Sequence, residues 1–189
     1  MTRFALLVFV GCAEDLRPAL HDGGGDVRPP GSVTTESLPD GTRVSVVDAS
    51  STEQWIHVDF ETQAKVDQAG AWDLRFQRFH ISTNGGVSGT GGVEIAAVPN
   101  TTLSATTTSP ADGFLADAAD GEDTNADPDY AFEQGDGWYD YDPLTHVLTP
   151  FPTVYVVRTN GGGTIALAIQ SYYDDAGTAG WFTFQWKAL

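Results

Sequence analysis

Residues 153–173 read TVYVVRTNGGGTIALAIQSYY, and this stretch carries the clearest structural signal in the chain. Two segments rich in apolar and β-branched residues, 153–157 and 164–173, flank the dipeptide Asn160-Gly161. Asn-Gly between two such segments is typical of a β-hairpin, because both residues tolerate the positive φ that tight hairpin turns require. We therefore predict a pair of antiparallel strands here.

The same period of two recurs on both sides of this stretch. In QWIHVDF, Ile56, Val58 and Phe60 fall on one face of a strand, and WFTFQW near the C-terminus does the same with alternate aromatic residues. Within these and neighbouring strands, His57 and His80 are expected on the faces of a sheet. No amphipathic helix longer than two turns is evident. The sequence predicts an all-β domain over residues 41–189, built as an antiparallel β-sandwich or a partly closed sheet.

One segment breaks the alternation. In WDLRFQRFHIS the apolar positions include Leu74 and Phe76 and then change parity to Phe79 and Ile81. A change of parity inside one strand is typical of a β-bulge, which the sequence predicts near residues 77–78.

Charge excludes one class of partner. The 189 residues carry 26 Asp and Glu against 9 Lys and Arg, a net charge of −17. Such a chain cannot gain from counterion release on a phosphate backbone, so no nucleic acid binding is expected. It also repels an anionic membrane surface, so a membrane is expected as a partner only through a covalent lipid anchor.

The N-terminus provides a candidate for that anchor. Residues 1–12, MTRFALLVFVGC, combine one early cation, a short apolar run and a closing Gly-Cys. The run is far shorter than the roughly 20 apolar residues of a membrane-spanning helix. The segment resembles a bacterial lipoprotein signal, which implies lipidation of Cys12 and an exported protein of the outer membrane or cell surface. A plain secretory signal with an incidental cysteine is the alternative. Residues 13–40, rich in Gly, Pro and Asp, are predicted to form a flexible tether.

A long polar segment, residues 101–137, interrupts the strands and ends in carboxylates. Hard cations such as calcium bind clusters of carboxylate oxygens, and five residues are candidate ligands: Asp117, Asp120, Asp123, Asp127 and Asp129. The spacing does not match an EF-hand, and a solvated loop without calcium is the other interpretation.

Catalysis is not predicted. The segment GGVSGTGG, residues 85–92, places a serine among glycines but lacks the Gly-x-Ser-x-Gly pattern of a nucleophile elbow. No pair of carboxylates is singled out for acid-base work either. We therefore expect a binding protein and not an enzyme.

Three blocks in order carry a family resemblance. WDLRFQRFHISTNGGVSGTGG, then GWYDYDPLTHVLTPFPTVYVVRTNGGGTIALAIQSYY, then GWFTFQW, resemble the HmuY family over the chain from about Val44 to the end. That family comprises exported, usually lipidated β-rich proteins of bacterial surfaces. The resemblance implies an HmuY-like β-fold and binding of haem or a related tetrapyrrole for iron acquisition. It also implies transfer of that ligand to an outer-membrane transporter.

The resemblance also implies where haem would lie. In its best-known members two imidazoles grip the iron, one from the segment before the Trp-Tyr block and one just after its Trp. Here residues 101–137 contain no His, Met or Cys, so His146 is the one predicted iron ligand, with Trp138, Tyr139 and Tyr141 as pocket walls. Tyrosine oxygen could supply a further ligand. The alternative function is a surface adhesion or interaction module, possibly stabilised by calcium, that has the fold without binding haem.

Overall fold

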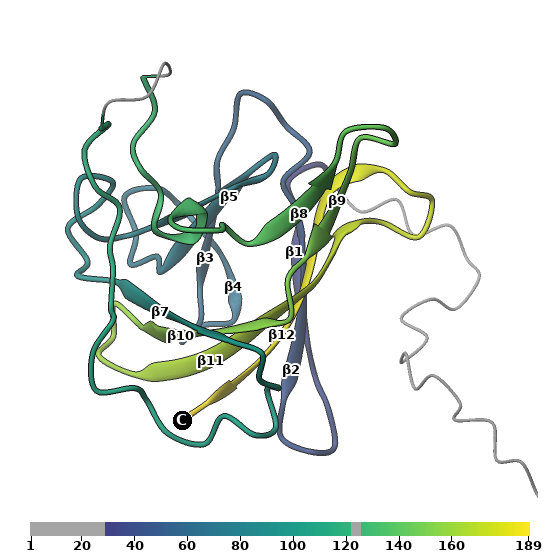
Figure 1. Ribbon diagram of the computed structural model, residues 1–189. Helices are drawn as coiled ribbons and strands as arrows, with labels where there is room; N and C mark the ends of the chain where they lie inside the picture. The colour runs from purple at the N-terminus through teal and green to yellow at the C-terminus, as the bar shows by residue number, and fades with distance from the viewer. Residues whose placement is uncertain (1–28, 122–125) are drawn as a thin grey trace, which may run out of the picture.

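A computed structural model describes residues 29–121 and 126–189, and these form an all-β structure with three antiparallel sheets. Cys12, the predicted lipidation site, and Asp123, a candidate calcium ligand, lie outside the described residues. The predicted all-β class is confirmed (Figure 1). No helix in the described part of the chain is long and apolar enough to cross a bilayer.

The largest sheet has six strands in the order β1-β2-β12-β11-β10-β7. Its strands are β1 (Val33–Ser37), β2 (Arg43–Asp48), β12 (Ala179–Ala188), β11 (Thr164–Tyr173), β10 (Thr153–Arg158) and β7 (Glu94–Pro99). The second sheet runs β4-β3-β5-β6, with β4 (Ala64–Val66), β3 (Ile56–Asp59), β5 (Leu74–Gln77) and β6 (His80–Thr83). The third pairs β8 (Tyr139–Asp142) with β9 (Val147–Pro150), and one 3₁₀ turn, η1 (Ala131–Glu133), precedes it.

The predicted hairpin at Asn160-Gly161 is confirmed. Strands β10 and β11 pair antiparallel from Val154↔Ala168 to Arg158↔Thr164, and residues 159–163 make the turn. Thr159 closes this turn, because its amide donates to the Gly163 carbonyl at 3.0 Å and its hydroxyl accepts from the Gly163 amide at 3.0 Å.

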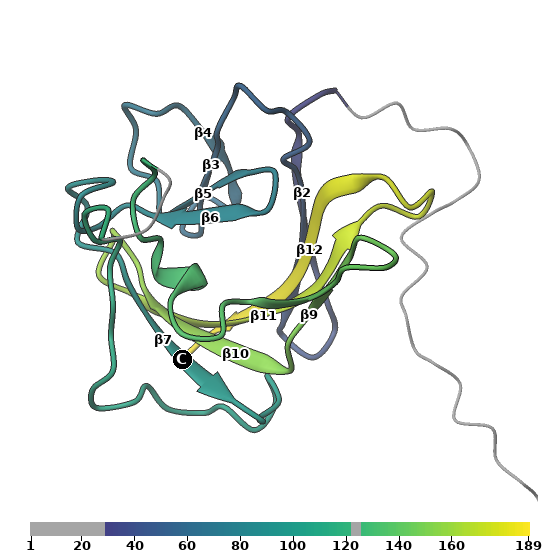
Figure 2. The same cartoon turned by 45° about the horizontal axis from the view of Figure 1, so that its top comes forward.

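The main core lies between the six-stranded and four-stranded sheets (Figure 2). Phe76 of β5 stacks on Phe184 of β12 with ring centroids 5.7 Å apart. Phe182 of β12 also contacts the ring of Phe76, with centroids 5.2 Å apart. Ile56 and Val58 are buried beside them, as the alternation in the sequence predicted. Burial of such side chains contributes about 1.5–3 kcal/mol each, so this inter-sheet layer is the main stabilising feature of the fold.

The predicted β-bulge near residues 77–78 is wrong. The segment is a hairpin in which Gln77 of β5 pairs with His80 of β6, and Arg78 and Phe79 form a two-residue turn. Arg78 has a φ of 49°, and its amide donates to the Ala49 carbonyl at 2.7 Å. Apolar parity changes because the chain reverses direction there. A tertiary contact with residue 49 holds the turn, so no Asn-Gly signal marks it.

The predicted tether over residues 13–40 differs from the structure at its C-terminal end. Residues 33–37 form β1, which pairs along its whole length with β2. Just before it, the Gly31 amide donates to Asp48 Oδ2 at 2.9 Å and Lys65 Nζ donates to the Gly31 carbonyl at 3.0 Å. The folded part therefore begins earlier than composition indicated, because pairing with β2 compensates for the weak local preference of residues 33–37 for extended structure.

Candidate functional site

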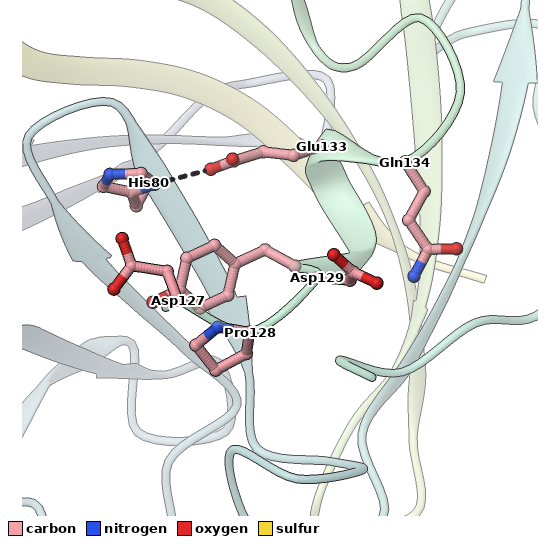
Figure 3. A pocket seen from close by; sticks show the side chains of 7 residues that line it. His80, Asp127, Pro128, Asp129, Glu133 and Gln134 are labelled. Carbon is pink, nitrogen blue, oxygen red and sulfur yellow. Dashed lines mark hydrogen bonds and ion pairs between the residues drawn. The ribbon is translucent and has the colours of Figure 1, made fainter. Parts of the chain in front are cut away.

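A pocket of about 210 Å³ opens where β6 faces the end of the polar segment (Figure 3). Its walls combine one imidazole, one phenol and several carboxylates: His80, Asp127, Asp129, Tyr130 and Glu133 are among the lining residues. We call it the His80 pocket. Figure 3 shows the imidazole of His80 directed at the carboxylate of Glu133, which projects from η1.

His80 is held by this carboxylate. Its Nδ1 lies 2.8 Å from Glu133 Oε1, and the two side chains are 24% and 30% exposed. Its Nε2 has no hydrogen bond to any described residue. An imidazole whose Nδ1–H is fixed by a carboxylate presents Nε2 in a defined direction, an arrangement usual for metal-binding histidines. His80 thus has the carboxylate partner that metal-binding histidines usually have.

Asp117 holds η1, the element that carries Glu133, through hydrogen bonds. The Asp117 side chain is 2% exposed. It accepts a hydrogen bond at 3.0 Å from the amide of Ala131, the first residue of η1. It also accepts the Ser82 hydroxyl at 2.7 Å and both the amide and hydroxyl of Thr83, at 3.1 and 3.0 Å. Asp117 therefore joins the polar segment to β6, and its carboxylate oxygens are used by protein donors.

Tyr130 also lines the His80 pocket. It is 4% exposed, and burial, with a further contribution from the negative charge of Asp127, raises the pKa of its phenol to about 12. Tyr130 is therefore protonated at neutral pH and is a poor source of the phenolate oxygen that binds iron.

Aromatic rings connect this pocket to β8. His80 lies between the rings of Tyr130 and Phe79, at centroid distances of 5.3 and 4.1 Å. Phe79, which is 37% exposed, meets Tyr139 of β8 at 6.3 Å. Because alternate residues of a strand share a face, Tyr141 extends this surface along the same side of β8. The four-stranded sheet and the β8–β9 hairpin thus share a partly exposed aromatic surface.

The structure places the four residues predicted as one site in two pairs, Trp138 with Tyr139 and Tyr141 with His146. Trp138 is 1% exposed and packs against Phe182 at 5.2 Å, while its indole N–H donates to the Phe79 carbonyl at 2.9 Å. It is a core residue and cannot form an open pocket wall, which corrects that part of the prediction. Tyr139 is partly buried and contacts both Trp138 and Phe79.

His146 lies elsewhere, at the tip of the β8–β9 hairpin. It has a φ of 59°, is exposed, and hydrogen-bonds through Nδ1 to the hydroxyl of Tyr141, itself 46% exposed. Neither residue lines the His80 pocket. His146 as an iron ligand stays a prediction.

The candidate calcium ligands are also spread out. Asp117 is buried, Asp120 is exposed, and Asp127 and Asp129 line the His80 pocket. A different trio, Asp59, Glu61 and Asp73, has carboxylate oxygens within 4.8 Å of one another. Protein groups donate to all three; Asp73, for example, accepts from the amides of residues 60 and 160 at 2.8 and 2.7 Å.

Sequence reasoning missed the His80 pocket because its parts are distant in the chain. His80 and Glu133 are 53 residues apart, and neither stands in a motif. The one available signal was the position of His80 beside exposed Phe79 in a strand, which is also compatible with an ordinary sheet-face residue.

Comparison with known proteins agrees with the fold. An HmuY-like protein from Bacteroides vulgatus, proposed to bind haem, superposes with a TM-score of 0.64 at 17% identity, over 82% of this chain and 96% of that one. The apo HmuY analogue of Tannerella forsythia gives a TM-score of 0.59 at 18% identity, covering 86% and 98%. A Bacteroides fragilis protein, proposed to be a lipoprotein, gives 0.61 at 21% identity, covering 82% and 93%.

No curated protein sequence matches the chain. A family model described as HmuY protein matches residues 51–186, which include the four-stranded sheet, the polar segment, the β8–β9 hairpin and most of the six-stranded sheet. On this match, the chain belongs to the HmuY family.

Proposed function

We propose that this protein binds haem or a related tetrapyrrole at the His80 pocket and the aromatic surface beside it, without catalysing a reaction. The observation that carries the proposal is the His80–Glu133 pair, with Nδ1 fixed at 2.8 Å, beside the exposed ring of Phe79. An imidazole supplies the iron ligand, and aromatic rings pack well on the apolar face of a porphyrin.

The pocket fits only part of a haem. Its volume of about 210 Å³ is below the roughly 300–1,000 Å³ of typical ligand sites, so the rest of the macrocycle would cover Phe79 and Tyr139 outside it. Asp127, Asp129 and Glu133 repel the propionates, which would therefore point to solvent. This charge arrangement favours one orientation of the ligand, with its carboxylates away from the polar segment.

The proposed context is iron acquisition at a bacterial surface. Family membership supports an exported protein, and the Cys12 signal supports a lipid anchor in the outer membrane or on the cell surface. The protein would then deliver its ligand to an outer-membrane transporter.

A haemin titration followed at the Soret band tests the proposal on the full chain. We expect a saturable shift that is lost in His80→Ala and weakened about 10–100-fold in Glu133→Gln, which keeps the side-chain shape but weakens the hold on the imidazole. His146→Ala tests the ligand predicted from the sequence and serves as the matched histidine control.

The outcomes separate the alternatives. Loss of the shift only in His146→Ala would place haem at the hairpin tip and refute the His80 site. An unsaturable response of the wild type in both redox states would refute haem binding and favour the interaction-module alternative.

A further inference from the structure

A second pocket, of about 470 Å³, lies at the other end of the outer face of the four-stranded sheet. Three loops meet there: the turn before β5, the loop after β6, and the β10–β11 turn. Its lining includes Gln68, Trp72, Arg75, Ser88 and Asn160. We call it the Arg75 pocket. It shares no lining residue with the His80 pocket.

Arg75 is the cation of this pocket. It stands on the outer face of β5, with its guanidinium carbon 4.4 Å from the ring centroid of Trp55 and 5.4 Å from that of Trp72. Its Nε donates to the Ser82 hydroxyl at 3.0 Å. Its two terminal nitrogens make no hydrogen bond or ion pair with any described residue. The planar guanidinium is therefore held by two rings, with its carboxylate-binding edge unpaired.

The charge around Arg75 is unusual for this chain. The net charge is −17, yet none of the described residues lining the Arg75 pocket is acidic. The His80 pocket, in contrast, includes Asp127, Asp129 and Glu133. Trp55 contacts both Tyr130 of the acidic pocket and Arg75 of the cationic one. An anionic ligand is favoured in the Arg75 pocket.

Neutral polar groups surround this cation. The Ser88 hydroxyl is buried with no hydrogen-bond partner among the described residues. The amide side chain of Gln68, an exposed residue, also lines the pocket. Asn160 uses its Nδ2 on the Trp72 carbonyl at 3.4 Å, and its Oδ1 has no described donor. Hydroxyl and amide groups of this kind pair with the hydroxyls of a polar ligand.

The loop that carries Ser88 is fixed. The Asn84 side chain accepts the Gly91 amide at 3.1 Å and donates to the Trp72 carbonyl at 2.7 Å. A Cβ on Gly89 would lie 2.0 Å from Asn84 Oδ1, so only glycine allows this close packing. A pocket of this size with a fixed loop is preorganised for a small ligand, which lowers the entropic cost of binding.

We propose that the Arg75 pocket binds a small acidic sugar of the uronic acid class. The sugar carboxylate pairs with the free edge of the Arg75 guanidinium, and the ring hydroxyls contact Ser88, Gln68 and Asn160. The pocket volume accommodates one or two sugar rings. This site is separate from the His80 pocket and does not depend on haem binding.

Isothermal titration of the full chain with galacturonate and its disaccharide tests the proposal. Galactose, which lacks the carboxylate, and acetate, which lacks the hydroxyls, are the matched ligand controls. We expect saturable binding of the uronate, at least tenfold tighter than that of either control.

Three variants locate the site. Arg75→Gln is expected to weaken uronate binding at least tenfold, whereas Lys187→Gln, which removes one positive charge from β12, leaves it unchanged. Gln68→Glu adds one negative charge at an exposed lining position and is expected to weaken binding several-fold. Because it removes no described hydrogen bond, it keeps the proposal testable if Arg75→Gln fails to fold by circular dichroism.

Several results would overturn the proposal. These are the absence of saturable uronate binding, equal binding of galactose or acetate, or unchanged affinity in folded Arg75→Gln. If uronate does not bind while haemin affinity falls in Arg75→Gln, the guanidinium serves a haem propionate and the acidic-sugar assignment is wrong.

Discussion

Replacing Asp117 with alanine removes a carboxylate that holds the polar segment to the four-stranded sheet. Asp117 accepts four hydrogen bonds, from the Ser82 hydroxyl, the Thr83 amide and hydroxyl, and the Ala131 amide. In the variant the two hydroxyls can rotate to new partners, but the two amides stay buried and unpaired. Each buried donor without a partner costs about 1–3 kcal/mol. With the lost charge-assisted bonds, we expect the free energy of unfolding to fall by about 3–5 kcal/mol.

Urea unfolding of the wild type and the variant measures this difference directly, and the melting temperature should fall by roughly 6–20 °C. Asp120→Ala is the matched control, because Asp120 lies in the same segment, is exposed, and should change stability by less than about 0.5 kcal/mol. A loss below about 1 kcal/mol in Asp117→Ala would refute the reasoning, since it would mean that water or other groups replace the carboxylate at little cost.

Three further predictions concern stability. Burial raises the pKa of Asp73 to about 6, above the usual 3.8, so the folded state binds more protons than the unfolded state between pH 4 and 6. Asp73 therefore contributes about 3 kcal/mol to the free energy of unfolding below pH 4, and this contribution is lost as the pH rises through 6. Urea unfolding of Asp73→Asn should show a smaller loss of stability over that pH window than the wild type does. Trp138→Ala should destabilise the fold by about 3–5 kcal/mol in the absence of any ligand, and thermal unfolding that leaves it within 1 kcal/mol of wild type would contradict its place in the core. Gly86→Ala should lower the free energy of unfolding at least as much as a typical core truncation does, because Gly86 has a φ of 59° and an added Cβ would lie 1.8 Å from the Asp117 carbonyl oxygen. Urea unfolding equal to that of the wild type would count against the close approach of these two segments.

Periodicity was enough to predict the fold class, because strands with one buried face repeat every two residues. Ile56 and Val58 are buried as the alternation required, and the Asn160-Gly161 turn joins β10 to β11. The alternation also overstated the polar face, because His57 and Asp59 are both buried at 6% exposure. Trp72, which precedes β5, packs against His57 with ring centroids 5.0 Å apart.

The errors have a common physical origin. The turn at Arg78 depends on the Ala49 carbonyl, and β1 depends on its pairing with β2, so neither has a local signal in the sequence. Long-range contacts decide these elements, whereas turn chemistry decides the hairpin at Asn160.

The candidate site was harder to predict than the fold. His146 was selected because it follows the Trp-Tyr block, but the hairpin carries it to an exposed tip beside Tyr141. His80 is a candidate ligand because Glu133 holds its imidazole. Arg75 is a candidate binding residue because tryptophan rings hold its guanidinium beside the loop that follows β6. Such groupings depend on how loops fold over a sheet, and no spacing rule along the chain specifies them.

The position of β1 at the edge of the six-stranded sheet determines how the domain would respond to mechanical load. Tension from the N-terminal side reaches Gly31 first, where Asp48 and Lys65 hold its amide and carbonyl. Beyond that point the force meets the Val33↔Val47 pair at the open end of an antiparallel hairpin, so the backbone bonds break one after another instead of together. A domain tethered on that side would yield by peeling off one edge strand while the layer between the sheets stays closed.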